Sequence, residues 1–217
     1  MYYSLLTLNP RSHLVQREVA APYEMHRTLL QAFPVGKFGI ERSDPEAAGV
    51  LFRLDSHSDG ALTVLVQSHT EPDWSALKPG YLLEAPQVKQ RGLSLQAGQP
   101  LTFRLRANPT KRLGRGAEKN ASKRIGLYTE DEQLAWLARK GEQHGFCVLQ
   151  AQVSRDGTIM NEKAIERDGR EHKLEMLSVQ FDGVLQVTDA DKLVAAVETG
   201  IGSAKGFGFG LLSLAPA

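Results

Sequence analysis

Apolar and polar residues alternate most regularly over residues 101–108, LTFRLRAN. Leu101, Phe103 and Leu105 share one face, whereas the other face carries a threonine and two arginines. This period of two predicts a half-buried strand with a basic outer surface. Six other stretches have the composition of strands; they cover residues 2–8, 50–56, 61–68, 146–153, 172–187 and 206–216, and the fifth has room for one strand or two.

Three stretches repeat apolar residues at the spacing of a helix, three to four residues apart; they cover residues 22–33, 129–145 and 189–200. Pro22 suits the first turn of the first helix, because its missing N–H would have no partner there. Thr129 is placed to cap the second helix, with Glu132 at capping-box spacing. Gly141 is predicted to end that second helix.

The order of these elements indicates the fold class. From residue 101 onward the order is β-α-β-β-α-β, which is that of a ferredoxin-like domain. The earlier part reads β-α-β-β and fits the same plan less completely. We therefore predict an α+β protein of two tandem ferredoxin-like domains, residues 1–90 and 91–217, joined through the proline- and glutamine-rich stretch 85–100.

Composition narrows the class of protein. The chain has 217 residues, of which 41% are hydrophobic and 24% charged. It contains no apolar run near the ~20 residues that a membrane span needs, and its first residues lack the basic start and cleavage site of a signal peptide. We expect a cytoplasmic protein without a membrane partner. A single cysteine, Cys147, excludes an internal disulfide and a cysteine-based zinc site.

Positive charge is concentrated in one segment. Residues 104–124 hold eight Lys or Arg and one acid, a net charge of +7, so the other 196 residues sum to −6 against the total of +1. A concentrated basic stretch on a mildly acidic body is typical of a polyanion partner. A solvated surface loop would have the same composition, and both readings stand at this point.

Glycine is dense near the end of the chain, in GIGSAKGFGFG. A dinucleotide-binding loop is excluded, because Lys205 stands where its third glycine should be and the helix comes before the strand. Such a segment can form an anion-binding nest of backbone N–H groups, or a helix cap followed by packing glycines. The glycines concerned are Gly200, Gly202, Gly206, Gly208 and Gly210.

Three separated motifs resemble the CasE family, the CRISPR RNA endoribonucleases of type I-E systems within the repeat-associated (RAMP) proteins. They are PYEMHR at 22–27, FRLRANPTKR at 103–112 and GIGSAKGFGFGLLSLAP at 200–216. The resemblance implies a metal-independent endoribonuclease that needs no cofactor. It also implies cleavage of CRISPR repeat stem-loops to 2′,3′-cyclic phosphate and 5′-hydroxyl ends, with the product kept for the Cascade complex.

His26 and Tyr23 are the candidate catalytic residues. Three residues apart on a helix, they share one face and can reach a single substrate atom. A histidine with a pKa near ~6.5 can serve as general acid or base. A lone helical histidine is more often structural, and the resemblance is what makes His26 the principal acid–base residue and Tyr23 its assistant. No histidine pair has metal-ligand spacing, so we assign no metal site.

The remaining candidate residues would contact RNA, an interpretation that rests on their charge and on the resemblance. They are Arg27, Lys37, Arg104, Arg106, Lys111, Arg112, Arg155, Lys163, Ser203 and Lys205. Arg155 and Lys163 fall in a predicted basic hairpin. Two alternatives to the endoribonuclease stay open: a non-catalytic RNA-binding subunit of a CRISPR ribonucleoprotein, and an unrelated ferredoxin-like enzyme that acts on a small phosphate ligand.

Overall fold

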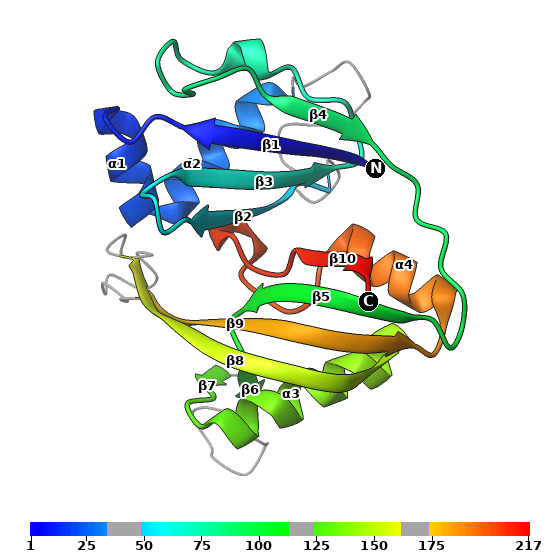
Figure 1. Ribbon diagram of the computed structural model, residues 1–217. Coiled ribbons are helices and arrows are strands. Elements are labelled where there is room, and N and C mark those ends of the chain that lie inside the picture. The colour runs from blue at the N-terminus through cyan, green and yellow to red at the C-terminus, as the bar shows by residue number, and fades with distance from the viewer. Residues whose placement is uncertain (34–48, 113–123, 162–173) are drawn as a thin grey trace. The chain divides into compact units, whose positions relative to one another are not determined.

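The computed structural model describes residues 1–33, 49–112, 124–161 and 174–217, and the side chains of all of these except 155–161, 174 and 175. The chain forms two compact units (Figure 1). Unit 1 comprises Met1–Ser94, Val197–Gly200 and Ala204–Leu211, and unit 2 comprises Leu95–Ala196, Ile201–Ser203 and Leu212–Ala217.

A four-stranded antiparallel sheet forms the frame of unit 1. Its order is β2-β3-β1-β4, from β1 (Tyr2–Leu8), β2 (Leu51–Ser56), β3 (Leu62–Ser68) and β4 (Gln87–Gln90). The helices of this unit are α1 (His13–Ala20), α2 (Pro22–Leu29) and the short 3-10 helices η1 (Leu30–Ala32), η2 (Trp74–Ala76) and η3 (Lys205–Phe207). Helix α2 packs on the sheet through apolar side chains. Its Met25 and Leu29 are fully buried in one core with Leu6 and Leu8 of β1.

Unit 2 repeats this topology. Its sheet has the order β10-β5-β9-β8, from β5 (Pro100–Ala107), β8 (Phe146–Asn161), β9 (Leu174–Val187) and β10 (Leu212–Pro216). Helices α3 (Glu130–His144) and α4 (Ala190–Thr199) connect its strands, and β6 (Thr110–Arg112) and β7 (Arg124–Gly126) form a separate two-stranded sheet. Both four-stranded sheets therefore place their first and third strands in the middle, which confirms the ferredoxin-like prediction.

The predicted alternation on β5 is confirmed. Leu101, Phe103 and Leu105 are buried, whereas Arg104 is exposed and Arg106 half-buried. The stretch 172–187 forms one strand, and residues 146–161 form a longer strand than the predicted 146–153. The last strand begins at Leu212 and not at residue 206, because the glycine-rich residues before it turn instead of extending.

Two local predictions were incomplete or wrong. A separate helix, α1, precedes α2, although no helix was predicted over 13–20. The Thr129 cap is confirmed, since its Oγ1 accepts a hydrogen bond of 3.3 Å from the Glu132 N–H. Gly141 does not end α3, which continues to His144 and stops at Gly145, a residue with a φ of +77°. A Cβ on Gly141 would lie 2.5 Å from the carbonyl oxygen of Phe146, so this glycine serves close packing.

Two late segments, Val197–Gly200 and Ala204–Leu211, belong to unit 1. Gln67 of β3 is fully buried and donates a 2.6 Å hydrogen bond from Nε2 to the Val197 carbonyl. Gly200, with a φ of +78°, packs so closely that a Cβ would lie 2.9 Å from the Leu51 methyl groups. The predicted domains, 1–90 and 91–217, placed all of these residues in the C-terminal domain, whereas Val197–Gly200 and Ala204–Leu211 belong to unit 1 and Ile201–Ser203 to unit 2. No helix among the described residues is long and apolar enough to cross a membrane.

Candidate active site

Helix α2 carries both candidate catalytic residues. Pro22 occupies its first turn, as predicted, and Met25 and Leu29 anchor one side of it in the core of unit 1. His26 lies next to this apolar side and is only 8% exposed, whereas Tyr23 is 43% exposed. The helix therefore presents a sheltered imidazole and an accessible phenol from neighbouring turns.

The His26 ring is held by packing. It stacks on Phe52 of β2, with ring centroids 5.8 Å apart and an interplanar angle of 12°. Its Nδ1 is buried and has no hydrogen-bond partner among the residues that the structure describes. Burial lowers the pKa of His26 from its ordinary value, because the charged form loses its hydration. The neutral imidazole is therefore the favoured form at neutral pH.

The ring of Tyr23 is tilted at 45° to that of His26. The two ring centroids are 6.4 Å apart, and Tyr23 packs more closely on Phe207, at 5.4 Å. Arg27, the next residue after His26, is 61% exposed in its side chain and forms a 3.2 Å ion pair with Glu24 on the same helix. The structure thus brings Tyr23 and His26 to one surface, and it gives Arg27 a local acidic partner.

The glycine-rich segment forms the wall of this surface. A Cβ on Gly206 would lie 3.3 Å from Cδ2 and 3.7 Å from Nε2 of His26, so only a glycine lets the backbone come this close without displacing the ring. Gly208 has a φ of +81° and approaches Phe52 in the same way, at 3.1 Å. Lys205 opens η3 and is half-buried. Gly200 follows α4 in the left-handed region, and Gly206 and Gly208 pack against His26 and Phe52, which is the predicted helix end followed by packing glycines. The anion-binding nest stays a prediction.

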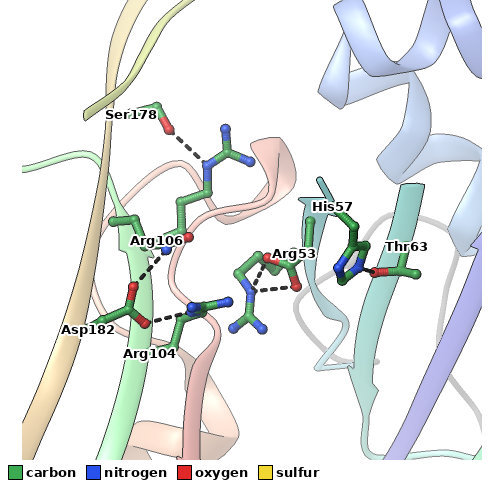
Figure 2. Close-up of polar contacts among 9 residues, drawn as sticks. Arg53, His57, Thr63, Arg104, Arg106, Ser178 and Asp182 are labelled. Atoms are coloured by element: carbon green, nitrogen blue, oxygen red, sulfur yellow. Dashed lines mark hydrogen bonds and ion pairs between the residues drawn. The ribbon is translucent and has the colours of Figure 1, made fainter. Parts of the chain in front are cut away.

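Several predicted RNA contacts in unit 2 have polar partners of their own. Figure 2 shows Arg104 beside Asp182, with an Nε–Oδ1 distance of 2.6 Å, and Arg106 donating to the Ser178 hydroxyl at 2.8 Å. Lys111 forms a 3.0 Å ion pair with Glu132 of α3. These cations are therefore oriented by neighbouring side chains.

Other cations gather around β6, β7 and α3. Arg112 faces Arg124 across the β6–β7 ladder, an arrangement of like charges that is unfavourable in itself. Lys140 of α3 lies near Arg124 and Arg139, and burial first, then these two charges, lower its pKa. Arg112, Arg124 and Arg139 have no acidic partner within the described ranges.

The remaining predicted residues divide into three groups. Ser203 is half-buried and belongs to unit 2. Arg155 lies in β8, where only its backbone is described. Lys37 and Lys163 lie outside the described residues. Among the described side chains, no group of three His, Cys, Asp or Glu is placed to hold a metal ion.

Sequence reasoning missed four residues that the structure singles out. Phe52 reads as an ordinary apolar strand residue, and only the three-dimensional pairing of β2 with α2 shows that it stacks on the histidine. Arg139 and Lys140 read as the solvated end of a helix. Arg53, buried and ion-paired with Asp55 at 2.9 Å, was also missed (Figure 2), although a charged residue within an apolar strand is a signal that could have found it.

Comparison with known proteins identifies the class of protein to which this fold and the surface around His26 belong. A model of the CRISPR-associated protein family matches residues 1–216, and the chain belongs to that family. It is 39% identical over 224 residues to the CRISPR-associated endoribonuclease Cse3 of Thermus thermophilus, with both chains covered in full. It is 35% identical over 204 residues to the Cascade subunit CasE of Escherichia coli, covering 89% of this chain and 92% of the relative.

Solved structures give the same result. The structure of Cse3 bound to a 19-nucleotide RNA superposes with a TM-score of 0.84 at 38% identity, and both chains are covered completely. The Escherichia coli protein Cas6e superposes with a TM-score of 0.69 at 29% identity, again over both entire chains. The resemblance to the CasE family is therefore confirmed along the whole chain.

Proposed function

We propose that this protein is an endoribonuclease that cuts CRISPR repeat stem-loops in precursor CRISPR RNA. The observation that carries the proposal is the arrangement of His26 and Tyr23 on α2 against the glycine-rich segment of unit 1. The full-length similarity to a protein named as a CRISPR endoribonuclease, and solved in complex with RNA, supports it.

The proposed chemistry uses the RNA's own 2′-hydroxyl. A base removes its proton, the oxygen attacks the adjacent phosphorus, and the bond to the 5′-oxygen of the next nucleotide breaks. The leaving oxygen takes up a proton from water or from the phenol of Tyr23, which gives a 2′,3′-cyclic phosphate and a 5′-hydroxyl end without a metal ion. His26 is the proposed base, because burial keeps its imidazole neutral and able to accept a proton. Tyr23 is exposed enough to contact the same phosphate.

The glycine-rich segment and the cations supply binding in this proposal. Lys205 is close in sequence to Gly206, which faces His26, and would place positive charge near the scissile phosphate. In unit 2, the unfavourable pairing of Arg112 with Arg124, and the nearby Arg139, would be relieved by an RNA phosphate backbone. The protein would keep its product and join a Cascade complex, as the name of its relative CasE suggests.

A non-catalytic RNA-binding subunit is the second candidate. It is favoured by the 8% exposure of His26, by an Nδ1 without an orienting partner within the described part of the chain, and by the 6.4 Å between the two candidate rings. In this case His26 is a packing residue on Phe52, and the protein binds repeat RNA without cutting it.

Cleavage of a labelled repeat hairpin in excess EDTA separates these candidates. The endoribonuclease should cut the all-RNA hairpin at one position, and a single 2′-deoxy sugar at the cut nucleotide should abolish cutting because the attacking hydroxyl is gone. The deoxy hairpin should still bind and serves as the matched control. Tight binding of both hairpins with no cleavage of either would favour the RNA-binding subunit. Cleavage of the deoxy hairpin would exclude the 2′-hydroxyl mechanism.

The pH dependence of kcat/KM tests the proposed role of His26. Since burial lowers the pKa of His26 from its ordinary value, the neutral base should predominate at pH 7, and kcat/KM should level off as the pH rises above this pKa. It should fall about tenfold per pH unit once the pH drops below the lowered pKa. The free energy of unfolding should change in the same direction. It should decrease as the pH falls through this pKa, because protonation of the buried imidazole disfavours the folded state. A kcat/KM that decreases as the pH rises through it would assign His26 the acid step instead.

A further inference from the structure

A buried carboxylate lies behind the helix that carries the proposed catalytic residues. Glu18, in the last turns of α1, is only 2% exposed. It has no cationic partner among the side chains that the structure describes. Two hydroxyl groups donate to it instead: Thr28 Oγ1 to Oε1 at 2.6 Å and Tyr81 OH to Oε2 at 2.7 Å. Burying a carboxyl group is costly, and hydroxyl donors of this kind are what makes the burial tolerable.

The two donors come from different parts of unit 1. Thr28 belongs to α2 and follows His26 by two residues, whereas Tyr81 lies in the connection between η2 and β4. Because successive residues of an α-helix are rotated by about 100°, Thr28 and His26 point to opposite sides of α2. The ring of His26 rests on Phe52 of the sheet, and Thr28 is tied to α1 on the other side. The helix is thus held from both directions.

Backbone contacts strengthen the same connection. The Ala21 N–H donates to the Glu18 carbonyl at 3.1 Å, so the residue that ends α1 also starts α2. Burial, and then the hydrogen bond to Glu18, raise the pKa of Tyr81 well above its ordinary value, which keeps the phenol protonated as a donor. Tyr81 is therefore a hydrogen-bond donor to Glu18 at neutral pH and not an anion.

We propose that Glu18 is a positioning residue, which sets the orientation of α2 and thereby of His26 through its hydrogen bond with Thr28. This inference rests on the proposed function, since it assigns a role in the same reaction. The two hydrogen bonds of Glu18 have different roles in this proposal. The bond from Thr28 orients the helix that carries His26, and the bond from Tyr81 only stabilises the fold. A misplacement of about 1 Å at a reacting group is enough to slow catalysis by ~10²-fold.

Matched substitutions of the two donors test this. Thr28→Val and Tyr81→Phe each remove one hydroxyl from the same carboxylate, so both should lower the melting temperature to a similar extent. Only Thr28→Val should lower the single-turnover cleavage rate at saturating RNA, by about tenfold or more, with RNA affinity unchanged. Thr28→Ser, which keeps the donor, should restore the rate. If valine prevents folding, Thr28→Ala replaces it in the comparison.

A second readout does not depend on cleavage. The NMR signal of the His26 Cε1 proton, assigned by its absence in His26→Phe, should shift or broaden in Thr28→Val and stay as in wild type in Tyr81→Phe. Equal rates and equal His26 signals in the two variants would overturn the positioning role and leave Glu18 a stability residue. If wild type does not cut RNA, the proposed function fails, and the NMR comparison alone then decides whether Glu18 orients His26.

Discussion

Replacement of His26 by alanine is expected to reduce cleavage of the repeat stem-loop by about 10²–10⁴-fold, the usual contribution of a general acid–base residue. RNA affinity should be almost unchanged, because His26 is 8% exposed and offers little surface to the RNA. The measurement is single-turnover cleavage at saturating RNA, with a separate binding titration on the 2′-deoxy hairpin.

Two further substitutions make this test specific. His26→Phe preserves a flat ring against Phe52 while removing both nitrogens, so it should be as inactive as alanine with less loss of stability. His57→Ala is the control and should cut normally, since His57 is exposed and its side chain hydrogen-bonds to Thr63 at 2.8 Å (Figure 2). If His26→Phe keeps most of the wild-type rate, the imidazole transfers no proton in the reaction.

Replacement of Gly208 by alanine is the second change with a large expected effect. Its φ of +81° costs an alanine roughly 1–2 kcal/mol, and the new Cβ would lie 3.1 Å from Phe52, the ring on which His26 stacks. We expect a loss of about 2–3 kcal/mol in the free energy of unfolding, together with about a tenfold slower cleavage, because Phe52 must shift.

Gly60→Ala is the matched control for Gly208→Ala. Gly60 has nearly the same φ, +82°, and a Cβ there would meet nothing within 4 Å. It should therefore show the backbone cost alone, about 1–2 kcal/mol, with normal cleavage. Chemical denaturation measures the first effect and single-turnover kinetics the second. Equal cleavage by the two variants would show that Phe52 can move without disturbing His26.

The sequence predicted the repeated strand order because that order follows from local patterns. The alternation on residues 101–108 and the Thr129 cap each depend on neighbours only a few residues away, and both are confirmed. The same local signals placed His26 and Tyr23 on one helix. Pro22 in the first turn and the helical spacing of the apolar residues Met25 and Leu29 predicted that helix.

What the sequence could not predict depends on distant contacts. A glycine at position 141 is typical of a helix end, yet its role is set by the Phe146 carbonyl that packs against it. Phe52 becomes part of the site only because β2 and α2 share one core. In the sequence Glu18 looks like any polar helix residue, and only the folded structure shows that Thr28 and Tyr81 both donate to it. Each of these roles is a matter of burial, which no local pattern encodes.

The late return of the chain to unit 1 has a consequence for synthesis of the protein. Proteins are made from the N-terminus, and early domains generally fold first. Here the first unit cannot be completed early, because the Val197 carbonyl that accepts a hydrogen bond from Gln67 is translated 130 residues after Gln67, and the Gly206 backbone that faces His26 follows later still. A nascent chain would therefore carry His26 on a formed helix but without its glycine wall. The surface around His26 would be finished only after Ala204–Leu211 are synthesised, so the site forms only once most of unit 2 has been translated.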